Sequence, residues 1–240
     1  ATSLSRVYSG GAAWSPFFAG MALVLTYVEG ARPHFIMMIG MPFAVLGFLV
    51  LVAEAWLFRR QQLQEFEGYP VSPANLLLPI CLTLMVLLCS VVLPDAPILT
   101  IISLSAIIVS FVIVSLSRGV VGASREFIMH VHRGLPAMAG ELLLFLAAGI
   151  LAVDVSAAVD AVNFTLPFDG RFDASMASLL LVAIIGCSAA GLHPVILITV
   201  SAPLLAPLGP DPQLLACVYV FAWGLGACVG PLSGMNLVFQ

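Results

Sequence analysis

One histidine lies inside a long apolar segment, beside residues that break helices. The segment runs from Ala174 to about Leu205 and carries Gly191, His193 and Pro194 in its middle. Ionisable groups at membrane depth are costly and usually line a pathway or pair with a partner, and imidazole changes its charge in the physiological pH range. We therefore predict that His193 binds an anionic substrate or carries a coupling proton. The structural alternative is a histidine that caps backbone carbonyls freed beside the proline.

A second break lies near the end of the chain, around Gly230 and Gly234. The hydroxyl of Ser233, the side-chain oxygen of Asn236 and the carbonyls of an unwound backbone are oxygen ligands that suit Na⁺. This pattern predicts a substrate or ion site. The alternative is packing, because a small residue recurs every four positions from Ala222 onward, and such a stripe lets helices approach closely.

The apolar segment from Gly11 to Val28 is interrupted in a similar way, at Ser15 and Pro16. Its sequence GAAWSPFFAGMALVL echoes GACVGPLSGMNLVF in the last segment: small residues, a break, Gly-Met and an aliphatic run. Two apolar stretches can match in this way by chance. If they are equivalent helices of two internal repeats, Ser15 and Pro16 belong to the same site, since many secondary transporters bind substrate at unwound helices of such repeats.

Two carboxylates also lie within apolar segments. Glu54 stands about one turn from Arg59 and Arg60 and is expected to reach the interface or pair with them. Glu141 stands near the N-terminal end of its segment, where the helix dipole favours a carboxylate; it is the second candidate for proton coupling after His193. The arginines all fall in loops or at segment ends, so the sequence offers no arginine clamp at membrane depth for a carboxylate substrate.

The composition places the chain in lipid. Of its 240 residues 62% are apolar and 8% charged, with a mean hydropathy of +1.16, whereas soluble domains carry about 25% charged residues. The length allows about seven spans of ~20–25 residues. The sequence has no basic patch interleaved with aromatics to favour nucleic acid, and its cysteine spacing fits no metal site. We expect an all-α integral membrane protein with no nucleic-acid partner and no metal beyond Na⁺.

The arginines predict the orientation, because cytoplasmic loops are enriched in basic residues. With a cytoplasmic N-terminus and alternating spans, Arg32 and Arg171 lie outside. The cytoplasmic side then holds Arg6, Arg59, Arg60, Arg118, Arg125 and Arg133.

These features divide the chain into three parts. Residues 1–58 hold a broken helix and one span that end a first repeat, and residues 59–74 form a cytoplasmic loop. Residues 75–240 form a second repeat, with broken or re-entrant segments near 191–194 and 230–236. Within it, residues 118–135 are mildly amphipathic and are expected to lie along the cytoplasmic face as an interfacial helix.

Three runs carry a resemblance to a known family: Leu142–Val159, Leu179–Pro207 and the broken helix Gly230–Asn236. Together they resemble the ion transporter superfamily, which includes divalent-anion/sodium symporters, the large membrane subunits of tripartite carboxylate transporters and arsenite-pump-like permeases. The resemblance covers roughly residues 136–240, with Gly11–Val28 as the partner. Where the symporters would show Ser-Asn-Thr, this chain has Gly-Leu-His-Pro from position 191 and Ser-Gly-Met-Asn from position 233.

The resemblance implies two inverted repeats with re-entrant hairpins, a homodimer, and a multi-pass place in the cell inner membrane. It also implies a secondary transporter that moves a small organic or inorganic anion by alternating access, driven by Na⁺ or H⁺. No cofactor is expected beyond possible Na⁺ near Ser233 and Asn236. Two alternatives stay open: an intramembrane hydrolase with Ser233 as nucleophile and His193 as base, and a channel or structural membrane subunit.

Overall fold

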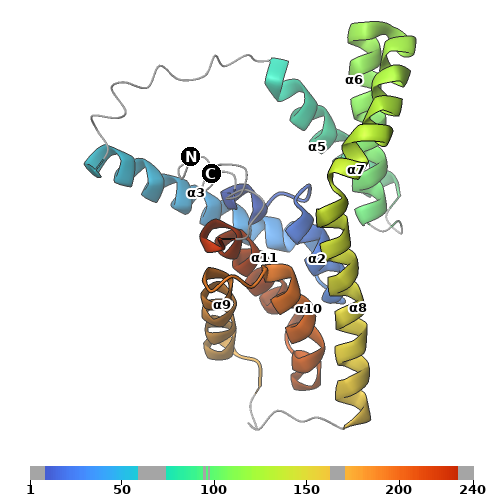
Figure 1. Ribbon diagram of the computed structural model, residues 1–240. Coiled ribbons are helices and arrows are strands. Elements are labelled where there is room, and N and C mark those ends of the chain that lie inside the picture. The colour runs from blue at the N-terminus through green and yellow to red at the C-terminus, as the bar shows by residue number, and fades with distance from the viewer. Residues whose placement is uncertain (1–8, 59–73, 94–95, 97, 163–170, 232–240) are drawn as a thin grey trace. The chain divides into compact units, whose positions relative to one another are not determined.

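The computed structural model describes residues 9–58, 74–93, 96, 98–162 and 171–231 (Figure 1). All regular structure within these residues is helical, which confirms the predicted all-α class. The chain divides into two compact units. The first unit comprises Ala1–Gln64 with Leu144–Gln240, and the second comprises Glu65–Leu143.

Among the described residues, four helical stretches are long and apolar enough to cross a membrane: Pro33–Phe58, Ile98–Ala137, Leu142–Ala161 and Pro212–Val229. The apolar helices at Leu77–Cys89, Ala174–Ala189 and Pro194–Leu208 are shorter. Large apolar side chains cover the outside of the first three of these stretches, as lipid-facing surfaces require, whereas Pro212–Val229 is half buried. The chain therefore has the character of a helical membrane protein, while the predicted total of seven spans and the inverted repeat stay predictions.

The second unit consists of α5 (Ala74–Val92), α6 (Ile98–Met129), the π-helical turn η1 (His130–Gly134) and α7 (Leu135–Ala137). Helix α6 packs along α5 and turns sharply at Gly119, whose φ of 73° and ψ of 163° suit only glycine. Arg118 and Glu126 form an ion pair across this turn. The segment predicted as an interfacial helix thus begins at a sharp turn and remains helical; its place along a membrane face stays a prediction.

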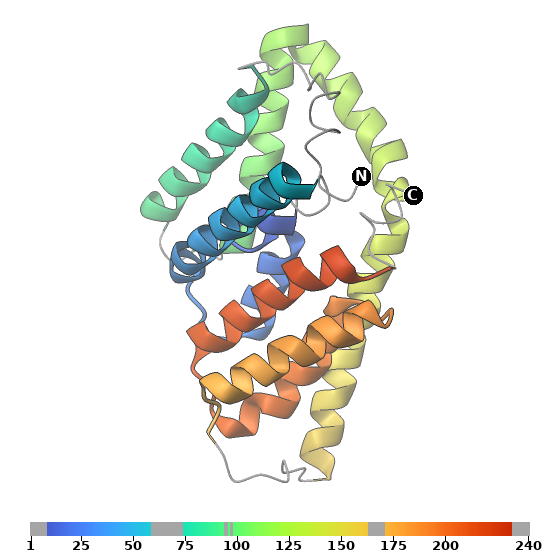
Figure 2. The same ribbon diagram turned by 90° about the vertical axis from the view of Figure 1, so that its left-hand side faces the viewer.

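The first unit contains α2 (Ala19–Tyr27), α3 (Pro33–Phe58), most of α8 (Ala139–Ala161), α9 (Ala174–Ala189), α10 (Pro194–Leu205), the short η2 (Ala206–Leu208) and α11 (Pro212–Val229). Helix α11 packs against α2, α3, α9 and α10 and is the central helix of this unit. Its neighbours α9 and α10 run beside it in Figure 2.

Short polar residues begin two of these helices. The Oδ1 of Asp173 accepts the N–H of Met176 at 2.9 Å, and the Oδ1 of Asp211 accepts the N–H groups of Gln213 and Leu214 at 3.0 and 2.9 Å. An aspartate in this position satisfies N–H groups that have no partner inside the helix.

Gln213 also fixes the start of α11 against the α2–α3 turn. Its Nε2 donates to the Gly30 carbonyl and its Oε1 accepts the Arg32 N–H, both at 2.9 Å. A single side chain thereby joins two segments far apart in the sequence.

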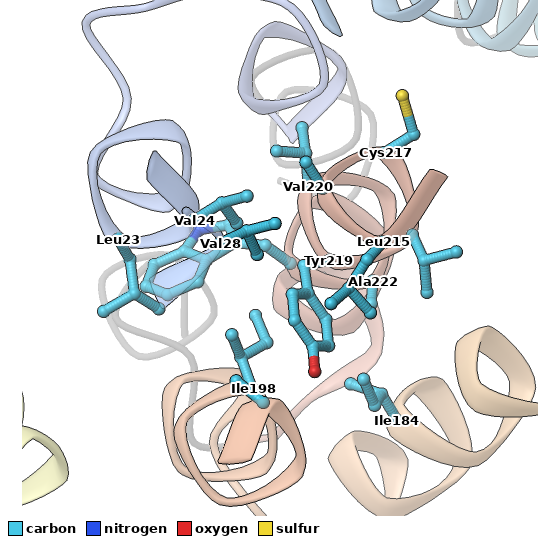
Figure 3. Packing of buried hydrophobic residues seen from close by; sticks show 14 of the residues in the cluster. Leu23, Val24, Val28, Ile184, Ile198, Leu215, Cys217, Tyr219, Val220 and Ala222 are labelled. Atoms are coloured by element: carbon cyan, nitrogen blue, oxygen red, sulfur yellow. The ribbon is translucent and has the colours of Figure 1, made fainter. Parts of the chain in front are cut away.

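The core of the first unit lies between α2, α9, α10 and α11 (Figure 3). Tyr219 of α11 is fully buried, and its hydroxyl points between Ile198 of α10 and Ile184 of α9. The hydroxyl lies 2.9 Å from the Oγ of Ser201, which itself donates to the Ile198 carbonyl at 3.3 Å. This buried polar group is therefore satisfied, as an apolar core requires.

Candidate functional site

The break between α9 and α10 is built from backbone hydrogen bonds and one glycine. Helix α9 ends with the N–H of Gly191 donating to the Ser188 carbonyl and the N–H of Leu192 donating to the Cys187 carbonyl, both at 3.0 Å. Gly191 has a φ of 104°, a left-handed conformation that residues with a Cβ rarely adopt. Pro194 then opens α10 as its first residue, where it has no N–H to leave unpaired.

His193 is the N-cap of α10. Its Nδ1 accepts the N–H of Val195 at 3.2 Å, and its carbonyl accepts the N–H of Ile196 at 3.0 Å. The side chain thus satisfies a backbone donor, whereas the structural alternative drawn from the sequence had it satisfy carbonyls. Because Nδ1 is the acceptor, the neutral ring carries its hydrogen on Nε2, and a proton added at Nδ1 would face the Val195 N–H.

Trp223 of α11 connects this break to two other helices, α8 and α2. The His193 ring meets the Trp223 ring edge-on, with centroids 5.7 Å apart and planes at 78°. Phe145 of α8 stacks on the same indole at 6.0 Å. On α2, a Cβ at Gly20 would lie 2.6 Å from the indole Cγ, so only glycine fits there.

Farther along α11, two glycines hold the α9–α10 break against this helix. A Cβ at Gly226 would lie 2.8 Å from the Cγ of Pro194 and 2.9 Å from the Oγ of Ser188. A Cβ at Gly230 would lie 3.3 Å from the Ser188 carbonyl. Ser188 is fully buried, and its hydroxyl donates to the Ile184 carbonyl at 2.7 Å.

The first break, between a helical turn at residues 9–12 and α2, packs against α11 as well. A Cβ at Gly224 would lie 3.1 Å from the Ser9 carbonyl. Gly40 of α3 approaches the Ala13 carbonyl so closely that a Cβ there would overlap it. Within the break, the Oγ of Ser15 accepts the N–H of Phe17 at 3.4 Å, so this hydroxyl satisfies freed backbone.

The predicted site residues are therefore partly united. His193, Pro194 and Gly230 meet around the C-terminal half of α11, and Gly191 belongs to the same break two residues before His193. The break that holds Ser15 and Pro16 packs on the same helix through its flanking residues. Ser233, Gly234 and Asn236 lie outside the described residues, as does the side chain of Glu141. The proposed pairing of Ser233 with His193 in a hydrolase is for that reason a matter for experiment.

Two helices begin and two end at this place. Helices α2 and α10 begin beside Trp223, and no side chain caps the first turn of α2. Helix α9 ends at Ala189 and α11 ends at Val229, and their C-cap residues Ala190 and Gly230 lie beside Ser188. Helix N-termini carry partial positive charge and C-termini partial negative charge. The first N–H groups of α2 are suited to an anion, whereas those of α10 are already bonded to His193. The carbonyl groups at the ends of α9 and α11 are suited to a cation.

No family model, curated protein or solved structure matches this chain.

Sequence reasoning missed Trp223, Ser188, Gly20 and Phe145. Gly226 belongs to the packing stripe that begins at Ala222 and to the segment that echoes Gly11–Val28. The stripe of small residues could have indicated Trp223 as a site residue, because Trp223 lies one position from Ala222 and large aromatic rings commonly pack over small residues. Phe145 and Gly20 carried no such signal, since they come from helices remote in the sequence.

Proposed function

We propose that this chain is a secondary active transporter that moves a small organic or inorganic anion by alternating access, with Na⁺ or H⁺ as the coupling ion. The observation that carries the proposal is the meeting of the helix breaks on the C-terminal half of α11. Broken helices at membrane depth are tolerated only where protein or a water-filled cavity satisfies their backbone groups. Transporters use such places to bind substrate.

The start of α2 and the ring of His193 support an anionic substrate. In the described part of the first unit, the two arginines stand at the far ends of the helices: Arg32 beside Gln213 at the start of α11, and Arg171 just before α9. An anion near Trp223 would then be held by the N-terminus of α2 and by the Nε2–H of His193, without an arginine clamp.

The ends of α9 and α11 support a coupling cation. Their last carbonyls lie near Ser188, whose hydroxyl oxygen keeps acceptor capacity after it donates to the Ile184 carbonyl. The Na⁺ site proposed near Ser233 and Asn236 follows directly after Gly230 in the chain. His193 supplies the proton-coupled alternative through its change of charge.

The proposal retains the inverted-repeat architecture, the homodimer and the inner-membrane location that the resemblance implies. A channel or a structural subunit would share the helices but would show no saturable, ion-dependent uptake.

The test is uptake by protein reconstituted in liposomes. Labelled succinate, phosphate and sulfate are offered with an inward Na⁺ gradient, an inward proton gradient or neither. We expect saturable uptake of at least one anion under one gradient. Gly226→Leu should reduce it at least about tenfold, because displacement of the Pro194 break by an ångström misplaces the site.

The matched control is Gly186→Leu in α9, where an added Cβ meets nothing within 4 Å. It should retain uptake within about twofold, as expected of an exposed substitution. Uptake that does not depend on any of the gradients would favour a channel. Uptake that is unchanged in Gly226→Leu would show that the cluster around Trp223 takes no part in transport.

A further inference from the structure

A groove of about 830 Å³ lies between α3 and α11, on the side of α11 away from Trp223. The two helices meet at one end, where the rings of Phe43 and Phe221 stack at 4.4 Å. Toward the end of α3 the space between them is lined by side chains of both helices and by residues 9–14. The volume falls in the range of sites that bind small molecules, about 300–1,000 Å³.

Both walls of the groove are regular apolar helix faces. Helix α11 contributes Phe221, Gly224, Leu225, Cys228 and Val229, which recur at helical spacing along one face. Helix α3 contributes a second row along its length, which includes Ala44, Gly47, Phe48, Leu51 and Glu54.

The groove opens toward hydrocarbon. Helix α3 is a candidate membrane span, and only 11% of its apolar window is buried within the protein. Groove residues such as Leu46 and Phe48 are 60% and 52% exposed. A dry apolar groove inside the bilayer is filled by whatever apolar chain reaches it from the membrane.

Glu54 adds one charge to this apolar lining. It stands four residues before Phe58, the end of α3, so it lies about 6 Å from that end at ~1.5 Å per residue. The helix has 26 residues and its length of about 39 Å exceeds the ~30 Å hydrocarbon core. The carboxylate therefore reaches the level where lipid headgroups begin.

We propose that the groove binds one phospholipid with a primary ammonium headgroup, of the phosphatidylethanolamine type. One acyl chain lies along the apolar row of α3 against α11, and the ammonium group donates hydrogen bonds to the Glu54 carboxylate. A carboxylate has four acceptor positions, so it can bind the lipid beside its own protein partner.

Charge complementarity selects this occupant over the transported anion. The described residues that line the groove include one carboxylate, that of Glu54, and no basic side chain, which matches an ammonium group better than an anion. The groove lies on the face of α11 opposite the Trp223 ring and shares residues 9–14 and Gly224 with the first break, and lipid binding is measured separately from transport.

The test measures lipid bound to the full chain by native mass spectrometry after extraction from nanodiscs. The discs contain equal amounts of phosphatidylethanolamine and phosphatidylcholine with the same acyl chains, because the choline headgroup carries the same charge without an N–H group. We expect a three- to fivefold preference for the ethanolamine lipid, about what a partly exposed ion pair supplies. Glu54→Gln should abolish the preference.

Gly47→Phe tests the groove itself, since a Cβ at Gly47 meets nothing within 4 Å and the ring would occupy the space of the chain. Retention of both lipids should fall, while the matched control Gly186→Phe on α9 should retain them. An ethanolamine lipid with a photoreactive acyl chain provides a readout on the unchanged protein. Its adducts should concentrate in Pro33–Phe58 and Pro212–Val229.

Three results would overturn the proposal. Equal retention of the two lipids would show that the headgroup makes no contact with Glu54. Adducts that are spread evenly over all the apolar helices would show that the lipid does not bind in the groove. A dimer that Gly47→Phe converts to monomer would show that a second copy of the chain occupies it.

Discussion

The two faces of α11 differ in what they touch. The packed face carries Tyr219, Ala222, Trp223, Gly226 and Gly230 and lies against α2, α9 and α10. The groove face carries Phe221, Leu225 and Cys228 and borders the open space beside α3. At about 100° per residue the two sets point in opposite directions.

The difference lies in residue size and contact. Glycines on the packed face bring helix breaks within van der Waals distance of α11, so that added atoms have no room. On the groove face larger apolar side chains meet open space, and lipid can supply their contacts. We infer that the packed face fixes the geometry of the site, while the groove face tolerates change.

The largest effect is expected for Gly226→Leu. The new side chain would meet the Pro194 ring and the Ser188 side chain, neither of which can move without shifting the break. Overpacking of this kind costs about 1–3 kcal/mol. Denaturant unfolding in detergent should show this loss of stability, with Cys228→Leu on the groove face as the comparison. Equal losses in both variants would break the distinction between the faces.

The next effect concerns the cap of α10. His193→Ala removes the acceptor of the Val195 N–H and should cost about 1 kcal/mol of unfolding free energy, the usual value of an N-cap. His193→Asn retains a cap and should restore most of this stability, but it cannot titrate. If His193 carries the coupling proton, both variants lose the pH dependence of uptake. Normal pH dependence in the asparagine variant would limit His193 to capping.

A smaller effect is expected for the buried hydroxyl pair of Tyr219 and Ser201. Removing one partner should cost about 0.6 kcal/mol, the average of interhelical hydrogen bonds in membrane proteins. A double-mutant cycle of Tyr219→Phe and Ser201→Ala should give a coupling energy of this size. Strict additivity of the two substitutions would show that the hydroxyl groups do not interact.

The smallest effect is expected on the groove face. Leu225→Ala should change the stability by less than about 0.5 kcal/mol, because lipid chains are as apolar as the leucine that is removed. A loss above that of the Tyr219 variant would mean that protein closes the groove.

The sequence predicted the helical class and the apolar surface, because both follow from composition and length. It also placed a helix interruption near 191–194, and α9 and α10 are separated there by residues 190–193. Glycine and proline are local signals of this kind and need no knowledge of the neighbouring helices. The turn at Gly119 escaped notice as a turn, although the predicted amphipathic stretch began one residue before it.

The neighbours of each helix could not be predicted. Helices α2, α3 and α9 are apolar all round, so they carry no polar stripe to indicate which face packs and which meets lipid. The position of Trp223 between Gly20, Phe145 and His193 depends on contacts among four helices. The groove had no sequence signal because it results from the way α3 and α11 diverge.

The most direct test of the central claim is ligand binding reported by Trp223 itself. The chain has three tryptophans, so Trp14→Phe with Trp56→Phe leaves only Trp223. Titration with carboxylates and oxyanions, with and without Na⁺, should give a saturable fluorescence change with at least one anion, and Gly226→Leu should abolish it. A folded protein whose Trp223 emission responds to no anion, while uptake persists, would contradict the assignment of the site to the packed face of α11.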